Sequence, residues 1–193
     1  MFIKSSEFCQ ALKKIGWSYV LIHIHIKIGT FDLLCDWIGI LLILSALDIL
    51  MKEEPSAALL RPFAGALTLV YLADSVLSLA GLALTDITLV QIITTVVWVY
   101  LQFQLLTNIA DMAQKREYPN TKRILQLRTG SCILNLIAMG VRYFDFLQNE
   151  ILMIMLIISL FVIIAWTWAV LRSVRIYLKE TSTDEEAPAY GST

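Results

Sequence analysis

Residues 151–171 read ILMIMLIISLFVIIAWTWAVL, a run without a single ionisable side chain. The hydrocarbon core of a bilayer is about 30 Å thick and an α-helix rises about 1.5 Å per residue, so about 20 apolar residues cross it. The whole chain agrees with this reading, because 58% of its 193 residues are hydrophobic, only 16% are charged, and the mean hydropathy is +0.73. A water-soluble domain of this size cannot bury so large an apolar excess. The sequence therefore predicts an integral membrane protein.

Three further windows of similar length and character precede this run. Residues 63–84 contain one acid, Asp74, and residues 87–110 contain no charge. Residues 124–147 contain three charged side chains, Arg128, Arg142 and Asp145. Each window is long enough to cross a bilayer, so we predict four clear transmembrane helices.

Residues 17–51 are too long for one straight span and short for two. In a five-span interpretation, residues 31–51 form one helix and residues 17–28 lie in the membrane interface. In a six-span interpretation, residues 12–28 form a short span, residues 29–35 a turn, and Asp36 caps a second helix over residues 37–51. The alternating isoleucines of residues 20–28 are also typical of a strand, but an isolated strand in lipid leaves its backbone groups unpaired, so we favour a helix.

The distribution of basic residues favours six spans. Segments 1–14, 52–61, 114–123 and 172–193 hold all 12 Lys and Arg residues of the predicted loops and ends. Lys and Arg concentrate on the cytoplasmic side, and only six spans place all of these segments there. We therefore predict an all-α membrane bundle of six transmembrane helices in three hairpins, the first pair short, with the N-terminus and C-terminus in the cytoplasm and the chain in the cell membrane.

The charge and cysteine content exclude other classes of protein. A net charge of −1 argues against nucleic-acid binding, and three widely spaced cysteines argue against a disulfide scaffold. Residues 179–193, KETSTDEEAPAYGST, are acidic and have no apolar period, which is typical of a disordered tail. We expect one transmembrane domain over residues 1–178 and a disordered cytoplasmic tail over residues 179–193.

Polar residues within the spans predict a polar interior. Gln91, Thr94, Thr95, Trp98 and Gln102 fall on one face of the helix expected over residues 87–110. A face of this kind turns toward neighbouring helices rather than lipid.

The other spans supply ionisable and amide groups to the same interior. Asp74 lies near the centre of its span, where a charge costs at least about 2.5 kcal/mol and normally has a partner or a water-filled cavity. The predicted interior residues are Asp74, Gln91, Thr95, Gln102, Asn135 and Arg142. They form either a pathway or pocket for a small polar solute or ion, or hydrogen bonds between helices worth about 0.6 kcal/mol each.

A second group of polar residues lies at the predicted turn on the outer side. His23, His25, Asp32 and Asp36 are residue types that bind divalent metals. His23 and His25 lie about 200° apart on a helix, however, and cannot chelate one ion together there. We therefore expect turn and capping roles, with no metal and no cofactor.

The segment IKIGTFDLLCDWIGILLIL, residues 26–44, resembles a pattern in small polytopic membrane proteins of low-GC Gram-positive bacteria, with a consensus similar to IGxFDLLPDWIGYILI. Matching positions include Gly29, Asp32, Asp36 and Gly39, whereas Cys35 replaces the proline of the pattern. Proteins with this pattern have no assigned activity. The resemblance implies a bacterial membrane setting and a helix break over residues 32–36, and it supplies no mechanism.

The functional expectation follows from the polar interior. Sequence motifs of the common hydrolases and nucleotide-binding enzymes are absent, so we do not expect an enzyme. We expect translocation or sensing of a small solute or ion, and the alternative is a non-catalytic membrane interaction or assembly protein. The expected partners are membrane lipid and either another protein or a second copy of the chain, and not nucleic acid.

Overall fold

The structure is a computed structural model that describes residues 3–23, 27–28, 31–32, 36–82, 84, 87–143 and 150–186. Within these residues the chain is almost entirely helical. The elements are α1 (Ser5–His23), β1 (Lys27–Ile28), β2 (Phe31–Asp32), α2 (Asp36–Leu50), η1 (Pro55–Leu60), α3 (Arg61–Ser78), α4 (Thr88–Lys115), α5 (Thr121–Tyr143) and α6 (Glu150–Glu186). The predicted all-α class is confirmed, and β1 and β2 add one short antiparallel pair with Ile28 opposite Phe31.

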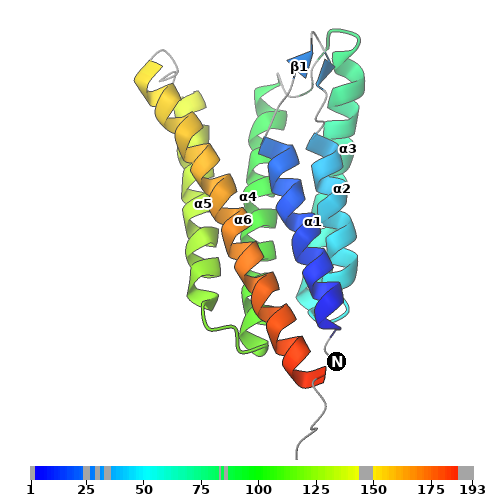
Figure 1. Cartoon of the computed structure of the whole chain (residues 1–193). Helices are drawn as coiled ribbons and strands as arrows, with labels where there is room; N and C mark the ends of the chain where they lie inside the picture. Colours follow the sequence, from blue (N-terminus) through cyan, green and yellow to red (C-terminus); the bar gives the residue numbers. More distant parts are fainter. Residues whose placement is uncertain are drawn as a thin grey trace, which may run out of the picture.

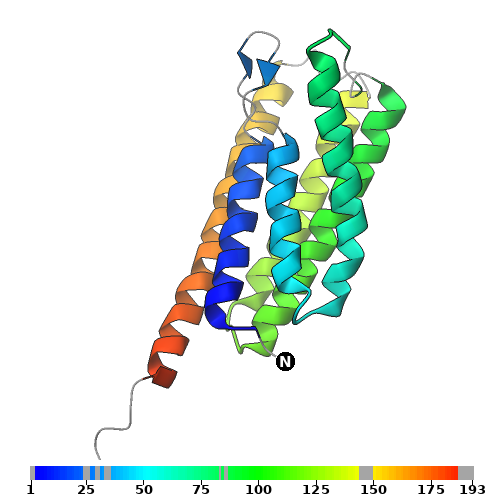
Figure 2. The same ribbon diagram turned by 90° about the vertical axis from the view of Figure 1, so that its right-hand side faces the viewer.

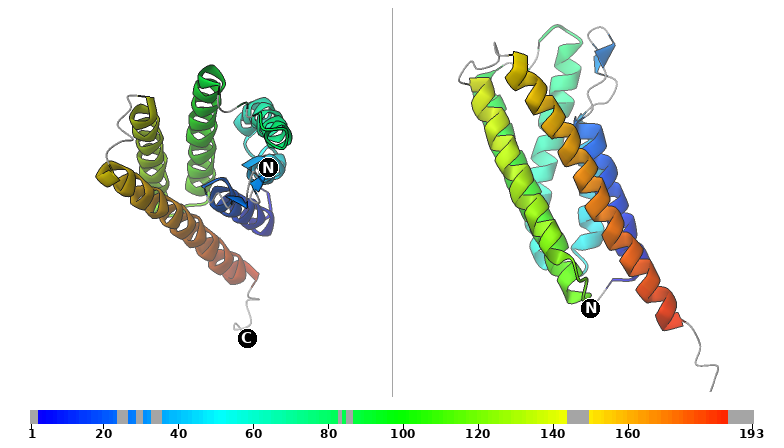
Figure 3. Two further views of the ribbon diagram at one scale, coloured as in Figure 1. Left: turned by 90° about the horizontal axis from the view of Figure 1, so that it is seen from above. Right: turned by 60° about the vertical axis from the view of Figure 1, so that its left-hand side comes forward.

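The six α-helices run alternately up and down in one bundle (Figures 1 and 2). We call the end near the N-terminus, η1 and residues 116–120 the basal end, and the end near β1, β2 and residues 79–82 the strand end. α1 packs against both α2 and α6, and α4 packs against α5. Viewed from above, α5 and α6 form one side of the bundle and α1, α2 and α3 the other (Figure 3).

Four segments are long and apolar enough to cross a membrane: Pro55–Ser78, Thr88–Lys115, Thr121–Val141 and Ile154–Thr181. They correspond to the four predicted windows and are consistent with a multi-pass membrane protein. α1 and α2 have 19 and 15 residues and do not meet the same criteria. Large apolar side chains on the outside of the long helices, such as Leu69, Val96, Leu136 and Phe161, are more than half exposed and are suited to contact with lipid.

Several helix ends differ from the predicted ones. α1 begins at Ser5 and ends at His23, so the chain leaves the helix earlier than residue 28. α3 ends at Ser78 instead of residue 84, because Gly81 adopts a φ of 76° and the Leu82 N–H donates to the Leu77 carbonyl over 3.0 Å, which closes the helix in a Schellman motif. α6 continues to Glu186, past residue 179 where we expected disorder to begin.

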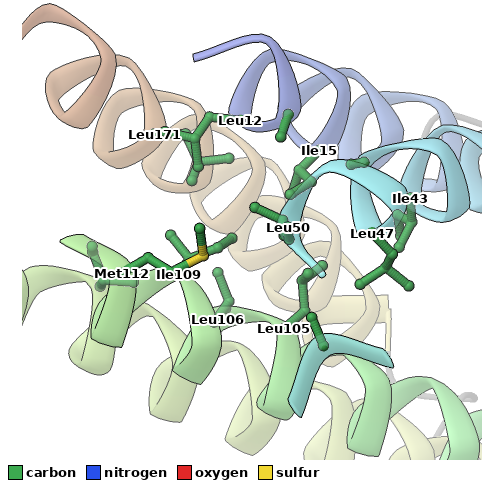
Figure 4. Packing of buried hydrophobic residues seen from close by; sticks show 14 of the residues in the cluster. Leu12, Ile15, Ile43, Leu47, Leu50, Leu105, Leu106, Ile109, Met112 and Leu171 are labelled. Carbon is green, nitrogen blue, oxygen red and sulfur yellow. The ribbon is translucent and has the colours of Figure 1, made fainter. Parts of the chain in front are cut away.

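The basal half of the bundle contains a dry core. Leu12 and Ile15 of α1, Leu50 of α2 and Leu105 and Ile109 of α4 are fully buried and lie within one cluster (Figure 4). Neighbouring core residues in the same view are Ile43, Leu47, Leu106, Met112 and Leu171. α1 and α2 thus belong to the packed bundle and do not lie apart from it.

Ion pairs fasten the connections at the basal end. Arg116, after α4, pairs with Glu53, before η1, and the two side chains are only 10% and 3% exposed. Lys115 donates to Glu54 over 2.7 Å, and this hydrogen bond holds the pKa of the Glu54 carboxyl below its usual value. These pairs join the loop after α2 to the end of α4, which are more than 60 residues apart in the chain.

Candidate functional site: a polar cluster in the strand half

A pair of amide side chains, one fully buried and one partly buried, lies between α4 and α5. The Asn135 Nδ2 group donates to Gln102 Oε1 over 3.0 Å and to the Ser131 carbonyl over 2.8 Å. Gln102 has no exposed surface, and Ser131 is fully buried as well. Two of the predicted interior residues, Gln102 and Asn135, are therefore in direct contact.

Three rings from α1 and α4 lie next to this amide pair. Tyr19 is 1% exposed, and its ring centroid lies 6.1 Å from that of Trp98 and 5.9 Å from that of His23. The His23 Nδ1 atom lies 2.8 Å from the Tyr19 carbonyl oxygen. Because a carbonyl oxygen only accepts, Nδ1 is the donor in this hydrogen bond.

Hydrogen-bonding capacity in this cluster is not used up by the protein. Among the described residues, the Tyr19 hydroxyl and the Gln102 Nε2 group are buried without a hydrogen-bond partner. Gln102 lies near enough to act on the Tyr19 phenol, but the two groups do not meet hydrogen-bond geometry. A buried polar group left unpaired costs about 1–3 kcal/mol, so such groups normally hold water or a ligand.

A second group of polar side chains lies closer to the strand end. Asp36 begins α2, and Asp74 lies one turn before the end of α3. Both carboxylates act electrostatically on the Tyr71 phenol, which also interacts with the Thr94 hydroxyl of α4. The fold thus brings Asp36, which we assigned to the outer turn, into the neighbourhood of Asp74, which we assigned to the interior.

The remaining predicted residues are distributed as follows. Gln91 and Thr95 lie partly buried on α4, where the Thr95 hydroxyl donates to the Gln91 carbonyl over 2.8 Å. Arg142 belongs to α5 and Asp32 to β2, but their side chains lie outside the described residues, as does all of His25. Trp98, Thr94 and Gln102 are buried, so the polar face of α4 is turned into the bundle.

Tyr19 and Tyr71 are the site residues that the sequence analysis missed. Tyr19 is almost fully buried and its ring lies against Trp98 of α4, and Tyr71 interacts with both carboxylates and with Thr94. A signal for both was present, because a tyrosine inside an apolar span must satisfy its hydroxyl group somewhere within the protein.

The polar cluster does not continue through the molecule. Below Gln102 on α4, the inward residues Leu105, Leu106, Ile109 and Met112 are all fully buried and apolar. The basal half is filled mainly by apolar side chains (Figure 4). Its buried polar exception on α4 is Asn108, whose Oδ1 atom accepts from Ser56 and Gln104 and whose Nδ2 group has no hydrogen-bond partner among the described residues.

The donor set suits hydrogen bonding and charge attraction rather than tight chelation. Within the part of the chain that the structure describes, no group of three His, Cys, Asp or Glu residues is placed to hold a metal ion. Amide and phenol groups bind water or a small polar solute, and carboxylates attract cations.

Comparisons with known proteins identify no relative. No family model matches the sequence, no curated protein matches it, and no solved structure matches the fold.

Proposed function

We propose that this membrane protein binds a small cation in the polar cluster of the strand half and uses this binding for translocation or sensing. The proposal is supported most strongly by the Tyr19 hydroxyl and the Gln102 Nε2 group, which lie buried near Asn135 and have no hydrogen-bond partner among the described residues. Asp36 and Asp74 supply the negative charge that selects a cation over a neutral solute.

The shape of the bundle supports entry from the strand end. α1 and α2 are about 28 and 22 Å long at 1.5 Å per residue, less than a full bilayer core. β1 and β2 lie at the level of the end of α3, and β2 contacts α3 (Figure 2). Non-helical backbone at membrane depth is tolerated where it lines a polar cavity, and a helix beginning at that depth directs its N-terminus into it.

In this structure the packed basal core limits how far a solute can enter from the strand end. A solute that reaches Gln102 meets Leu105, Leu106 and Ile109 and can go no further without a rearrangement of the helices. The geometry therefore supports binding from one side, which is the first step of both translocation and sensing.

We also propose the six-span topology, with the basal end in the cytoplasm of the cell. The described parts of all four predicted basic segments lie at or near the basal end, as the positive-inside rule requires. Reporters fused to the N-terminus and to the C-terminus should both be active in the cytoplasm, and a tag inserted near residue 86 should be accessible only from outside. A reporter showing the two termini on opposite sides would contradict the topology.

Cation binding should depend on Asp74. In detergent at constant ionic strength, Na⁺, K⁺ or choline in place of N-methylglucamine should raise the unfolding temperature of the wild-type chain. A ligand at 100 times its Kd adds about 2.7 kcal/mol to stability. The Asp74→Asn variant should insert into the membrane normally. It should need at least a tenfold higher cation concentration than the wild type for the same rise in unfolding temperature.

The matched control is Asp48→Asn, which removes an exposed carboxylate paired with Arg61 near the basal end. It should keep the full response. An Asp74→Asn variant that responds as the wild type does, or a wild type that responds to none of the three cations, would overturn the proposal and leave the assembly role. Flux of the responding cation into proteoliposomes then separates translocation from sensing.

A further inference from the structure

A basic groove lies between α1 and α6 toward the basal end, away from the polar cluster. It has a volume of about 280 Å³ and is lined by Cys9, Lys13, Arg172, Arg175, Ile176 and Lys179. Four of these six residues are cationic and none is acidic. The groove joins segments far apart in the chain, since the Cys9 thiol of α1 lies 3.7 Å from the Arg175 carbonyl of α6.

Arg175 has unused hydrogen-bonding capacity in this groove. Its Nε atom is buried and has no hydrogen-bond partner among the described residues. Its guanidinium lies 5.6 Å from the centroid of the Trp168 ring, which fixes its position from one side. Arginine binds phosphate through two parallel N–H donors, and lysine adds a point charge.

Tryptophans place the groove at the level of lipid headgroups. Trp17 of α1 and Trp168 of α6 pack edge to face with their centroids 5.3 Å apart, and Trp17 is 47% exposed. Trp17 lies one helical turn from Lys13, and Trp168 one turn from Arg172. Tryptophan is enriched at the boundary between hydrocarbon and headgroups, so the cations lie just beyond the hydrocarbon.

An apolar stripe leads from the membrane interior to the groove. Ile158, Val162, Ala165 and Ala169 follow one another at helical spacing on α6 and end at Arg172, and all four are exposed. An acyl chain can lie along this stripe while its phosphate meets the cations. A soluble phosphate compound would use the groove but not the stripe.

We propose that the groove binds the phosphate headgroup of an acidic phospholipid whose acyl chain lies along the exposed stripe of α6. The proposal requires only that the long helices span a membrane, and it does not depend on cation binding in the polar cluster. Basic pockets between membrane helices on the cytoplasmic side are suited to anionic lipid headgroups.

Native mass spectrometry of the full chain in neutral detergent tests the proposal. Dioleoyl phosphatidylglycerol should reach a given bound fraction at a lipid concentration at least tenfold lower than dioleoyl phosphatidylcholine needs. The variant Arg172→Gln/Arg175→Gln should lose this preference. Lys13→Gln, on the other helix of the groove, should weaken it severalfold, because the site is built from both helices.

Matched controls separate the site from general surface charge and from free phosphate. Lys122→Gln/Arg123→Gln removes the same charge from exposed positions at the start of α5 and should keep the preference. Glycerol 3-phosphate at millimolar concentration should not displace the lipid. Equal retention of the two lipids, an equal loss in the control, or displacement by glycerol 3-phosphate would each overturn the proposal. Arg172→Gln alone leaves the partly buried Arg175 in place, so it should keep the wild-type unfolding temperature and still weaken the preference severalfold; an unchanged preference in this variant would also overturn the proposal.

Discussion

Arg116→Met should lower the free energy of unfolding by about 3–5 kcal/mol, because it leaves the Glu53 carboxylate buried without its partner. The Arg116 guanidinium donates to Glu53 Oε1 and Oε2 over 2.5 and 2.6 Å and to the carbonyl of Ile3 over 3.2 Å. It also lies 4.6 Å from the centroid of the Phe8 ring. One side chain therefore joins the N-terminal segment, the loop after α2 and the end of α4. Reversible unfolding by sodium dodecyl sulfate in mixed micelles, followed by tryptophan fluorescence, measures the loss.

Two further variants test whether the loss of stability in Arg116→Met comes from the buried ion pair. Glu53→Met/Arg116→Met should recover most of the loss, because removing both charges leaves no uncompensated ion. Arg61→Met breaks an ion pair with Asp48 whose side chains are 60% and 54% exposed, and it should cost less than about 1 kcal/mol. If Arg116→Met costs no more than Arg61→Met, the pair does not fasten the basal end.

Gly39→Leu should destabilise the chain by about 3 kcal/mol, the upper part of the usual range for overpacking. A Cβ atom at Gly39 would lie 2.5 Å from Ile22 Cγ1 and 3.1 Å from the Ser18 carbonyl oxygen of α1. The Ser18 backbone cannot move without shifting α1, so the larger side chain must push α1 and α2 apart. The same unfolding titration should show the loss, and cation binding near Tyr19 should weaken with it.

Gly65 provides the matched control for Gly39. It also lies within a helix, α3, but a Cβ atom there meets nothing within 4 Å. Gly65→Leu should therefore change stability little or raise it slightly, since glycine is a poor helix former. Gly39→Ala combined with Ile22→Ala should be more stable than Gly39→Ala alone. Equal losses at the two glycines would show that helix propensity, and not close packing, decides the effect.

Local patterns in the sequence were sufficient to predict the long helices and one polar face of the candidate site. The length and composition of four windows predicted four helices able to cross a membrane, and the structure confirms them. The spacing of Thr94, Trp98 and Gln102 predicted a polar face, and all three residues are buried. Such patterns depend on neighbours along one helix, which the sequence displays directly.

Contacts between distant segments were not predictable in the same way. Arg116 and Glu53 are 63 residues apart, and Cys9 and Arg175 are 166 apart. Tyr19 was missed because its surroundings come from α4, and the end of α3 at Ser78 was missed because the Schellman motif depends on Gly81 rather than on hydropathy. The basic residues could be counted from the sequence to orient the chain, but the position of Lys13 and Arg172 in one groove depends on the packing of α1 against α6.

α6 has 37 residues, which at about 1.5 Å per residue makes a rod of about 55 Å. A bilayer core of about 30 Å accounts for little more than half of that length, so the last turns, acidic in sequence, stand clear of the lipid as a continuous extension of the buried part. A small tilt of α6 against α1 would therefore move the C-terminal end of α6 further than it moves the part within the membrane. A probe attached to that end would report such a tilt most sensitively.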